Sequence, residues 1–353
     1  MDLNNKFFFL ILALSTLFFY KYFLYIKKKI GFKFLIDDNL SKPQAFHVTP
    51  VSTVGGVGIF LSFLIFFFYS FFFENFKYFE YFTFCSVFFF LGLLDDLRVN
   101  LKPKFRLLMM ISSLIVLVIF NNVYIEKTGL EFLNNFLEID IFALFFICLC
   151  FLFIINGSNL IDGFNGLLGI HALIIIINLF FLNYFGGNKD LAFILFSSII
   201  FLIAFLFYNF PKAKIILGDS GSYFLGAFIA LSTIKTSIAN PEISPFYFCI
   251  LLFYLFFEVF FSFLRKLLKE RKSPLFPDKK HLHMLVFEIF YKKNKDKIKS
   301  NYLVSIAINS IYLVLTIPAA LNMQNGLFCK YYSILFFVTY IYFYKTANKK
   351  TYY

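Results

Sequence analysis

The sequence has no tryptophan, and only 15% of its 353 residues are charged, whereas 60% are hydrophobic. A soluble globular domain carries about 25% charged residues, so this scarcity of charge excludes that class. The mean hydropathy of +0.79 indicates that lipid is the main surrounding of the chain. We therefore expect a polytopic integral membrane protein.

Cysteine and histidine are also scarce, with five and four residues. The cysteines lie in or beside apolar runs, and Cys148 and Cys150, two positions apart, would point to different faces of a helix. We interpret them as small hydrophobic residues, which argues against a disulfide framework and against a cysteine zinc site.

Eleven apolar runs are long enough to cross a membrane, which takes roughly 17 to 25 residues. They cover 6–26, 55–73, 78–94, 105–122, 140–156, 166–183, 190–208, 221–237, 245–264, 301–319 and 330–345. The first run lacks the small-residue cleavage pattern of a secretory signal and is followed by three lysines, so we expect a retained span. The predicted fold is all-α, with residues 1–353 forming a single membrane-embedded domain.

Basic residues are distributed unevenly between the two sides that alternating spans would create. Of the 33 Lys and Arg residues, 26 fall on one side, in 27–54, 95–106, 209–220, 265–300 and the C-terminal tail. The positive-inside rule predicts that this side is cytoplasmic, with the N-terminus outside and the C-terminus inside. The net charge of +13 then reflects loops that face anionic lipid, and we expect no nucleic-acid partner.

A polar island, Asn156 to Gly166, separates two apolar runs on the predicted cytoplasmic side. It gathers one carboxylate, three amides and three glycines where a span ends. Asp162 would cost about 3 kcal/mol at the centre of a lipid-exposed helix, so we expect it at the membrane surface. An ordinary turn between two helices explains the same pattern, and the other polar groups on this side decide between the two.

Two adjacent carboxylates, Asp95 and Asp96, end the run at 78–94. Four cations follow them: Arg98, Lys102, Lys104 and Arg106. Neighbouring carboxylates repel each other unless a cation neutralises them, so the pair suggests metal or phosphate chemistry. An exposed acidic turn is the alternative.

A second acidic motif, Gly218-Asp219-Ser220-Gly221-Ser222, opens the eighth run after a loop that begins at Asn209. It places a carboxylate and exposed backbone amides at the start of a helix. This suits a metal-bridged phosphate, since Mg²⁺ typically takes one or two protein carboxylates. Capping of the helix by Asp219 or Ser220 is the alternative, and both roles are compatible.

The largest loop contains Pro277-Asp-Lys-Lys-His281-Leu-His283. No further Cys or His follows at a zinc-site spacing, so phosphate recognition fits this cluster better than zinc. Upstream, Glu258 lies inside the ninth run, seven residues before Arg265. An ionisable residue in a span is a functional hypothesis by default, but we expect Glu258 to be the structural partner of a cationic group. His47 to Gly56, in the first loop, is interpreted as a helix-entry turn.

Together, these motifs resemble the polyprenyl-phosphate N-acetylhexosamine-1-phosphate transferases of glycosyltransferase family 4. The matching segments are Leu94-Asp95-Asp96, Asn156-x-x-Asn159-x-x-Asp162-Gly163-x-Asn165-Gly166-Leu167, Gly218-Asp219-x-Gly221-Ser222 and Pro277-Asp278-x-x-His281-x-His283. Three positions depart from the family pattern: Asn165 replaces an aspartate, Met284 a third histidine, and Ser52 a proline.

The resemblance implies transfer of an N-acetyl amino-sugar 1-phosphate from a UDP-sugar to a polyprenyl phosphate, expected to be undecaprenyl phosphate, with release of UMP. The reaction would initiate cell-envelope polysaccharide or peptidoglycan synthesis at the cytoplasmic face of a bacterial inner membrane. The implied cofactor is Mg²⁺, with Mn²⁺ as a substitute, and a homodimer is compatible with it.

The resemblance also implies roles for individual residues. Asp219 would ligate the metal together with Asp162 or Asp96, and Asp95 would orient or deprotonate the lipid phosphate. The predicted catalytic residues are Asp95, Asp96 and Asp162, and the predicted metal ligands are Asp219 and Asp162. The predicted substrate-binding residues are Asn156, Asn159, Asn209, Lys104, Arg106, His281 and His283.

Two other functions compete with this hypothesis. A transporter or flippase for a lipid-linked or anionic solute predicts polar groups near the midplane in broken helices and two related halves, but most spans lack such groups and no repeat is found. A membrane scaffold without chemistry requires all four aspartates to be incidental. Which UDP-sugar is used stays open, although the absent third histidine argues against a muramoyl-pentapeptide substrate.

Overall fold

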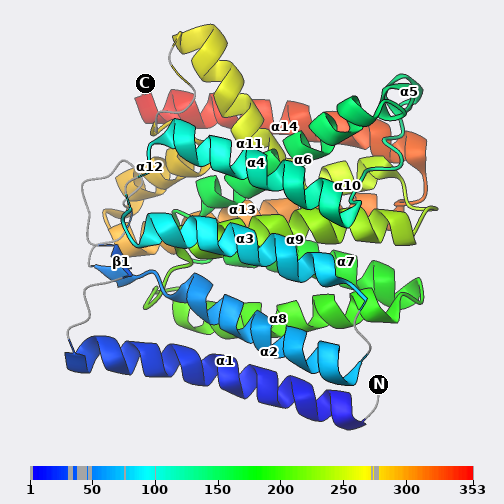
Figure 1. Cartoon of the computed structure of the whole chain (residues 1–353). Coiled ribbons are helices and arrows are strands. Elements are labelled where there is room, and N and C mark those ends of the chain that lie inside the picture. The colour runs from blue at the N-terminus through cyan, green and yellow to red at the C-terminus, as the bar shows by residue number, and fades with distance from the viewer. Residues whose placement is uncertain are drawn as a thin grey trace.

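The computed structural model of the chain describes residues 3–30, 35–37, 46, 50–74, 77–99, 101–271, 273 and 278–352. Helices that run in nearly the same direction make up most of it (Figure 1). They are α1 (Leu3–Ile30), α2 (Gly55–Phe73), α3 (Phe79–Asp96), α4 (Pro103–Asn121), α5 (Glu131–Leu137), α6 (Asp140–Ile161), α7 (Leu167–Phe185), α8 (Lys189–Asn209), α9 (Gly218–Ala239), α10 (Pro245–Leu251), α11 (Phe253–Leu264), α12 (Leu282–Asn294), α13 (Lys297–Leu321) and α14 (Gly326–Tyr352). A π-helix, η1 (Arg265–Glu270), continues α11.

The predicted all-α, polytopic class is confirmed, and each of the eleven predicted runs coincides with one of these helices or with the α10–α11 pair. Within the described residues, nine helices are long and apolar enough to cross a membrane, or ten if the bent α10–α11 pair is one span. Helix α3 is not among them and carries three carboxylates: Glu80, Asp95 and Asp96. Eleven crossings, and the orientation of the termini in a membrane, therefore stay predictions.

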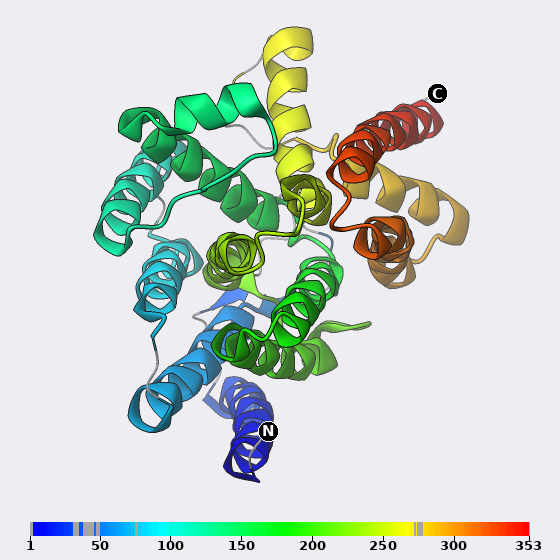
Figure 2. The same ribbon diagram turned by 90° about the vertical axis from the view of Figure 1, so that its right-hand side faces the viewer.

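Helix α9 is the central element of the bundle, and the other helices surround it when it is viewed end-on (Figure 2). In its most apolar window 72% of the residues are buried, more than in any other candidate span of the described chain. Small residues such as Gly221, Gly226 and Ala230 recur along it. In a membrane bundle such residues let helix backbones approach closely, which strengthens packing where the hydrophobic effect is absent.

Glycines set how closely the neighbouring helices approach the start of α9. A Cβ atom on Gly92 of α3 would overlap the carbonyl oxygen of Asp219, and a Cβ atom on Gly56 of α2 would overlap the backbone of Gly221. These two glycines therefore bring α2 and α3 against the Asp219 motif.

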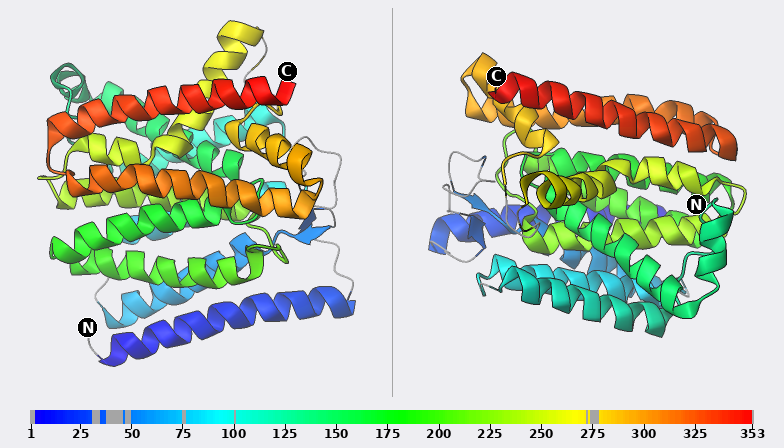
Figure 3. Two further views of the ribbon diagram at one scale, coloured as in Figure 1. Left: turned by 180° about the vertical axis from the view of Figure 1, so that it is seen from behind. Right: turned by 90° about the horizontal axis from the view of Figure 1, so that it is seen from above.

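A small sheet, which was not predicted, lies at one end of the bundle. Strand β1 (Ile36–Asp37) pairs antiparallel with β2 (Val51–Ser52), and Ser52 also bridges to Ile215 in the loop before α9. The C-terminus lies at this same end and the N-terminus at the opposite one (Figures 1 and 3). We call this the loop end of the molecule, because the predicted motifs also gather there.

The ninth predicted span is broken rather than continuous. Helices α10 and α11 with η1 meet at Leu252 with a bend of 73°, and α11 and η1 extend outward from the bundle (Figure 2). The break frees backbone groups that lipid could not satisfy. The hydroxyl of Tyr312 on α13 donates to the carbonyl oxygen of Leu251 at 2.5 Å, which compensates for part of the break.

The close approach of α3 and α9 predicts that Gly92→Ala destabilises the protein. The added methyl group must displace backbone, and overpacking of this kind typically costs 1–3 kcal/mol. Thermal unfolding of the purified protein in detergent measures the effect. Gly326→Ala is the matched control, because the nearest atom to its added Cβ would be the Ser244 hydroxyl at 3.8 Å. Equal melting temperatures for the two variants would contradict the packing argument.

Candidate active site

The polar island forms the turn between α6 and α7. Asp162 directly follows the last residue of α6, and Gly166, with a φ of +78°, directly precedes α7. The Asn209 side chain accepts a hydrogen bond from the Gly166 N–H at 2.6 Å and donates to the Ile215 carbonyl at 2.8 Å. Asn209 was predicted to bind substrate. In this structure it is buried, and its amide group joins the island to the loop before α9.

The Asp96 carboxylate caps the N-terminus of α9 from the neighbouring helix α3. Its two oxygens accept hydrogen bonds from the backbone N–H groups of Asp219 and Ser220, both at 2.9 Å. The first amides of a helix lack intrahelical partners, and a carboxylate there is stabilised by the helix dipole. The capping alternative for Asp219 and Ser220 is therefore wrong, because the cap is a residue 123 positions earlier in the chain.

The Asp219 side chain is tied to the polar island. The amide of Asn159 on α6 donates to Asp219 Oδ1 and, at 3.1 Å, to the Ser222 hydroxyl. The structure thus brings Asp96, Asp162 and Asp219 together at the loop end, although they come from three separate motifs. We call these three residues the aspartate cluster.

Asp162 is the member whose charge is least compensated. Burial and the nearby carboxylates of Asp219 and Asp96 raise the pKa of Asp162 well above its usual value. Among the described residues no hydrogen bond or ion pair reaches its carboxylate. A cation near Asp162 would therefore relieve a repulsion that the folded chain leaves in place.

Asp95 has a different environment from Asp96. Its Oδ2 accepts a hydrogen bond from the guanidinium of Arg106 on α4 at 2.8 Å. This ion pair compensates one carboxylate of the Asp-Asp motif, and the suggested metal or phosphate chemistry of the motif stays a prediction. Lys104, one of the predicted phosphate-binding residues, is exposed near the start of α4.

Asn156 lies on α6, and its side chain donates to the Leu152 carbonyl of its own helix at 2.7 Å. The structure does not bring it into contact with the aspartate cluster through any hydrogen bond of the described residues. Its predicted role in substrate binding stays a prediction.

Tyr223 is a residue that the motifs did not indicate. Its side chain is buried among the charges of Asp219, Arg106 and Asp95, and its hydroxyl has no hydrogen-bond partner within the described part of the chain. Tyr223 follows Asp219 by four residues, and residues so spaced lie on one helix face. That spacing is the signal that could have identified it.

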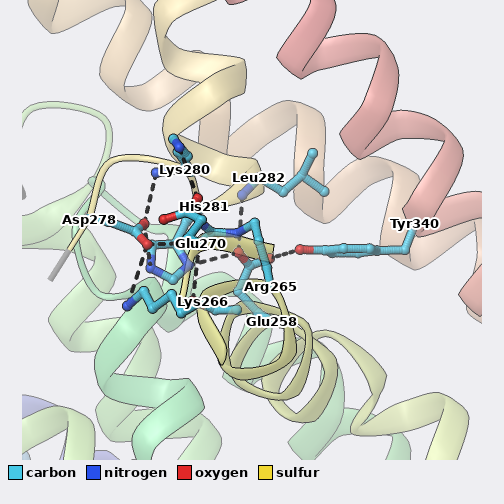
Figure 4. Close-up of polar contacts among 10 residues, drawn as sticks. Glu258, Arg265, Lys266, Glu270, Asp278, Lys280, His281, Leu282 and Tyr340 are labelled. Carbon is cyan, nitrogen blue, oxygen red and sulfur yellow. Dashed lines mark hydrogen bonds and ion pairs between the residues drawn. The ribbon is translucent and has the colours of Figure 1, made fainter. Parts of the chain in front are cut away.

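The histidine loop forms a second polar cluster, organised around Glu258 of α11 (Figure 4). Glu258 is 1% exposed. Its Oε1 accepts hydrogen bonds from His281 Nδ1 at 3.1 Å and from the Leu282 N–H at 3.0 Å, and its Oε2 accepts one from the Tyr340 hydroxyl at 2.6 Å. Glu258 is thus the structural partner that was expected, but its partner is His281 and not Arg265.

Arg265 instead pairs with Asp278 and Glu270, at 2.8 Å in each case. Burial alone would raise the pKa of Asp278, but the hydrogen bond from the Lys280 N–H and the neighbouring side chains of His281 and Arg265 hold that pKa at about 2. The Asp278 Oδ1 also faces His281 Nε2 at 3.5 Å. We call Glu258, Arg265, Glu270, Asp278 and His281 the histidine-loop cluster.

His283 connects the two clusters through the polar island. Its ring packs edge-on against Phe164 of the island, with ring centroids 5.7 Å apart, and its Nδ1 lies 3.3 Å from the Tyr254 hydroxyl. Burial lowers the pKa of His283 to about 3, so the ring is neutral at pH 7. The predicted motif residues His47 and Pro277 lie outside the described residues.

Known proteins are similar in sequence to the region that contains the aspartate cluster. The family model for "Glycosyl transferase family 4" matches residues 78–237, which contain the whole aspartate cluster. An undecaprenyl-phosphate alpha-N-acetylglucosaminyl 1-phosphate transferase of Thermotoga maritima is 31% identical over 237 residues, 67% of this chain and 68% of the relative. This chain belongs to glycosyl transferase family 4.

Two further relatives show how the similarity is distributed. The enzyme of the same name from Escherichia coli O157:H7 is 24% identical over 70% of this chain, which spans 64% of that relative. A phospho-N-acetylmuramoyl-pentapeptide-transferase of Streptococcus mutans is 32% identical, but over only 33% of this chain and 35% of its own length.

The donor set at the loop end fits a small hard cation. No group of three or more His, Cys, Asp or Glu residues in the described chain is arranged to hold a metal ion. Mg²⁺ needs only one or two carboxylates and completes its shell with water and substrate phosphates. The uncompensated Asp162 and the adjacent Asp219 meet that smaller requirement.

The raised pKa of Asp162 predicts that Asp162→Asn stabilises the protein at high pH. A carboxyl group whose pKa is raised on folding favours the folded state only when protonated. The gain in melting temperature should therefore be largest at pH 8 and shrink as the pH falls towards about 4, the ordinary aspartate value. Thermal unfolding in detergent without divalent cations tests this, with the exposed Glu138→Gln as control. A gain independent of pH would refute the electrostatic cause.

Glu258→Ala is expected to destabilise the fold by about 3 kcal/mol or more, because it leaves three buried polar groups without an acceptor and each typically costs about 1–3 kcal/mol. The His281 ring, the Leu282 amide and the Tyr340 hydroxyl would all lose their acceptor. Chemical denaturation measures the loss against Glu242→Ala, whose side chain is exposed. If the two variants unfolded at the same denaturant concentration, Glu258 would not hold the histidine loop.

Proposed function

We propose that this protein transfers N-acetylglucosamine 1-phosphate from UDP-N-acetylglucosamine to undecaprenyl phosphate, releasing UMP. The observation that carries the proposal is the aspartate cluster, three carboxylates from separate motifs held at one end of an apolar helix bundle. Membership of glycosyl transferase family 4 and the names of the relatives support the reaction class.

The choice of sugar rests on how far the similarity extends. The N-acetylglucosaminyl relatives match over about two thirds of this chain, whereas the muramoyl-pentapeptide relative matches over one third. Met284, in place of a third histidine, is a further departure that favours the smaller sugar.

The acidic residues would hold Mg²⁺, for which Mn²⁺ could substitute. Asp219 and Asp162 would be its ligands. When bound, the metal would neutralise the charge that develops on the sugar-nucleotide diphosphate. Asp96 would contribute indirectly. It accepts hydrogen bonds from the backbone amides of Asp219 and Ser220, and these bonds fix the position of the Asp219 backbone.

The chemical step needs alignment more than covalent help from the protein. An oxygen of the lipid phosphate forms a bond to the β-phosphorus of the UDP-sugar, and the bond from that phosphorus to the bridging oxygen breaks, so the bridging oxygen leaves with UMP. A phosphate monoester has a second pKa near 6, so the lipid phosphate is largely ionised at pH 7. Asp95 would therefore orient this group through Arg106 rather than deprotonate it.

The setting of the reaction follows from the charge distribution. Described cations of the predicted cytoplasmic loops, such as Arg98 and Lys104, lie at the loop end. This end would therefore face the cytoplasm of a bacterial cell, with the active site at the inner face of the cytoplasmic membrane. Lys104, exposed near the start of α4, would meet the phosphate of the membrane-embedded lipid there.

A transporter remains the second candidate, and one observation favours it. The α10–α11 pair is a broken span with an ionisable residue, a feature of transporter binding sites. Glu258, however, is fully engaged by His281, Leu282 and Tyr340, which leaves it poorly placed to bind a transported solute.

Release of UMP tests the proposal directly. Purified protein with Mg²⁺, undecaprenyl phosphate and a panel of UDP-sugars should release UMP with UDP-N-acetylglucosamine, and a chelator should abolish the release. Asp219→Asn should lower turnover at least 100-fold, the typical loss of a preorganised electrostatic group. Asp190→Asn, exposed at the other end of α8, should have no effect. No UMP from any sugar would overturn the transferase assignment, and near-normal turnover of Asp219→Asn would overturn the metal role.

A further inference from the structure

A cavity of about 350 Å³ lies among α11, α12, α13 and α14. It is separate from the aspartate cluster, none of whose members lines it. Helices α12 to α14 form one side of the molecule in Figures 2 and 3. The volume of the cavity is within the range of small-molecule sites, roughly 300–1,000 Å³. The walls of the cavity are almost entirely apolar. An apolar chain is the kind of occupant that such walls accept.

The residues that line the cavity form continuous stripes on two helices. On α14 they recur with helical spacing from Phe336 to Lys350, and on α12 they include Val286, Ile289 and Phe290. The same helical spacing places Lys293 next along the α12 stripe. Both apolar stripes therefore lead to a lysine near the C-terminal end of their helix.

These two lysine-bearing ends lie together at the loop end of the molecule. The ammonium group of Lys292 donates to the Thr351 carbonyl oxygen at 2.6 Å, which joins the end of α12 to the end of α14. Lys350 itself lines the cavity. Lys293 and Lys350 are both exposed. We call the end of the cavity that Lys350 lines its mouth. With Lys293 at the neighbouring end of α12, this mouth is cationic, and it lies where the predicted cytoplasmic membrane surface would be.

We propose that this cavity binds one acyl chain of an anionic glycerophospholipid, with the lipid phosphate at Lys350 and Lys293. An apolar cavity accounts for the chain, and the cationic mouth accounts for the charge of the headgroup. Near an anionic bilayer, each basic side chain contributes about 1 kcal/mol. This is a lipid site in addition to the substrate site, and it does not depend on the proposed function.

The site also explains how lipid would support the histidine loop. Two of its wall residues, Tyr254 and Tyr340, make polar contacts on their other side, with His283 and Glu258. An acyl chain in the cavity packs against the rings of these tyrosines and restricts their movement. Bound lipid is therefore expected to raise the melting temperature of the protein.

Lipid binding to the full-length protein in detergent, measured by native mass spectrometry, tests the proposal. Phosphatidylglycerol should bind at least fivefold more tightly than phosphatidylcholine with the same acyl chains. Lys350→Gln should weaken phosphatidylglycerol binding about fivefold, the equivalent of one interfacial charge. Lys345→Gln is the matched control, since Lys345 is exposed on the same helix and does not line the cavity.

A second pair of variants tests the cavity itself. Ala307→Phe fills it and should weaken the binding of both lipids at least tenfold, whereas Ile306→Phe, on an exposed neighbour outside the lining, should not. Equal binding of the two lipids, or wild-type binding by Ala307→Phe, would overturn the proposal. Displacement of phosphatidylglycerol by equimolar undecaprenyl phosphate would also overturn it, because the occupant would then be the polyprenyl substrate.

Discussion

The hydrogen bonds from the Asp219 and Ser220 amides to the Asp96 carboxylate are the contact on which the rest of the site depends. They join the end of α3 to the start of α9, the most buried candidate span of the described chain. Gly92 allows that junction because any side chain there would collide with Asp219. These bonds fix the backbone of Asp219, and the Asn159 amide then holds its carboxylate.

The sequence predicted the helices well because each apolar run carries its own evidence in hydropathy and length. It also predicted which loops gather, because alternation and the positive-inside rule place them on one side. The sequence could not predict which side chains form hydrogen bonds or ion pairs with each other, because such contacts join residues that are distant in the chain. Asp96 was expected to be catalytic, and in the structure both its oxygens accept hydrogen bonds from the backbone of α9. Arg265 is the cation nearest to Glu258 in sequence, but the residue that binds Glu258 is His281. The bend at Leu252 also had no signal, since neither proline nor glycine occurs there.

The aspartate cluster places carboxylates in buried surroundings that disfavour their charge. A buried carboxylate is expensive unless it is paired, and the fold pairs Asp95 with Arg106 and Asp96 with two amides. Asp162 is left without such compensation. Ionisable groups whose pKa is shifted by burial and by like charges cluster at functional sites. The bundle therefore keeps an electrostatic cost that a bound cation would remove, which makes Asp162 more informative about function than its better-satisfied neighbours.

The two polar clusters differ in how their charges are balanced, and this difference indicates that they have separate roles. In the histidine-loop cluster every carboxylate has a cationic or hydroxyl partner, so the cluster is a rigid brace. In the aspartate cluster, Asp162 has no such partner among the described residues, and burial and the neighbouring carboxylates raise its pKa. This cluster is therefore the part that a bound cation would stabilise. Phe164, which lies between Asp162 and Asn165 and packs on His283, joins the two. Glu258, which follows the bend at Leu252 on α11, binds His281 and Leu282 and so holds the histidine loop where His283 contacts the island. A straight ninth span would continue along the bundle, so the break in this helix is part of how the site is built.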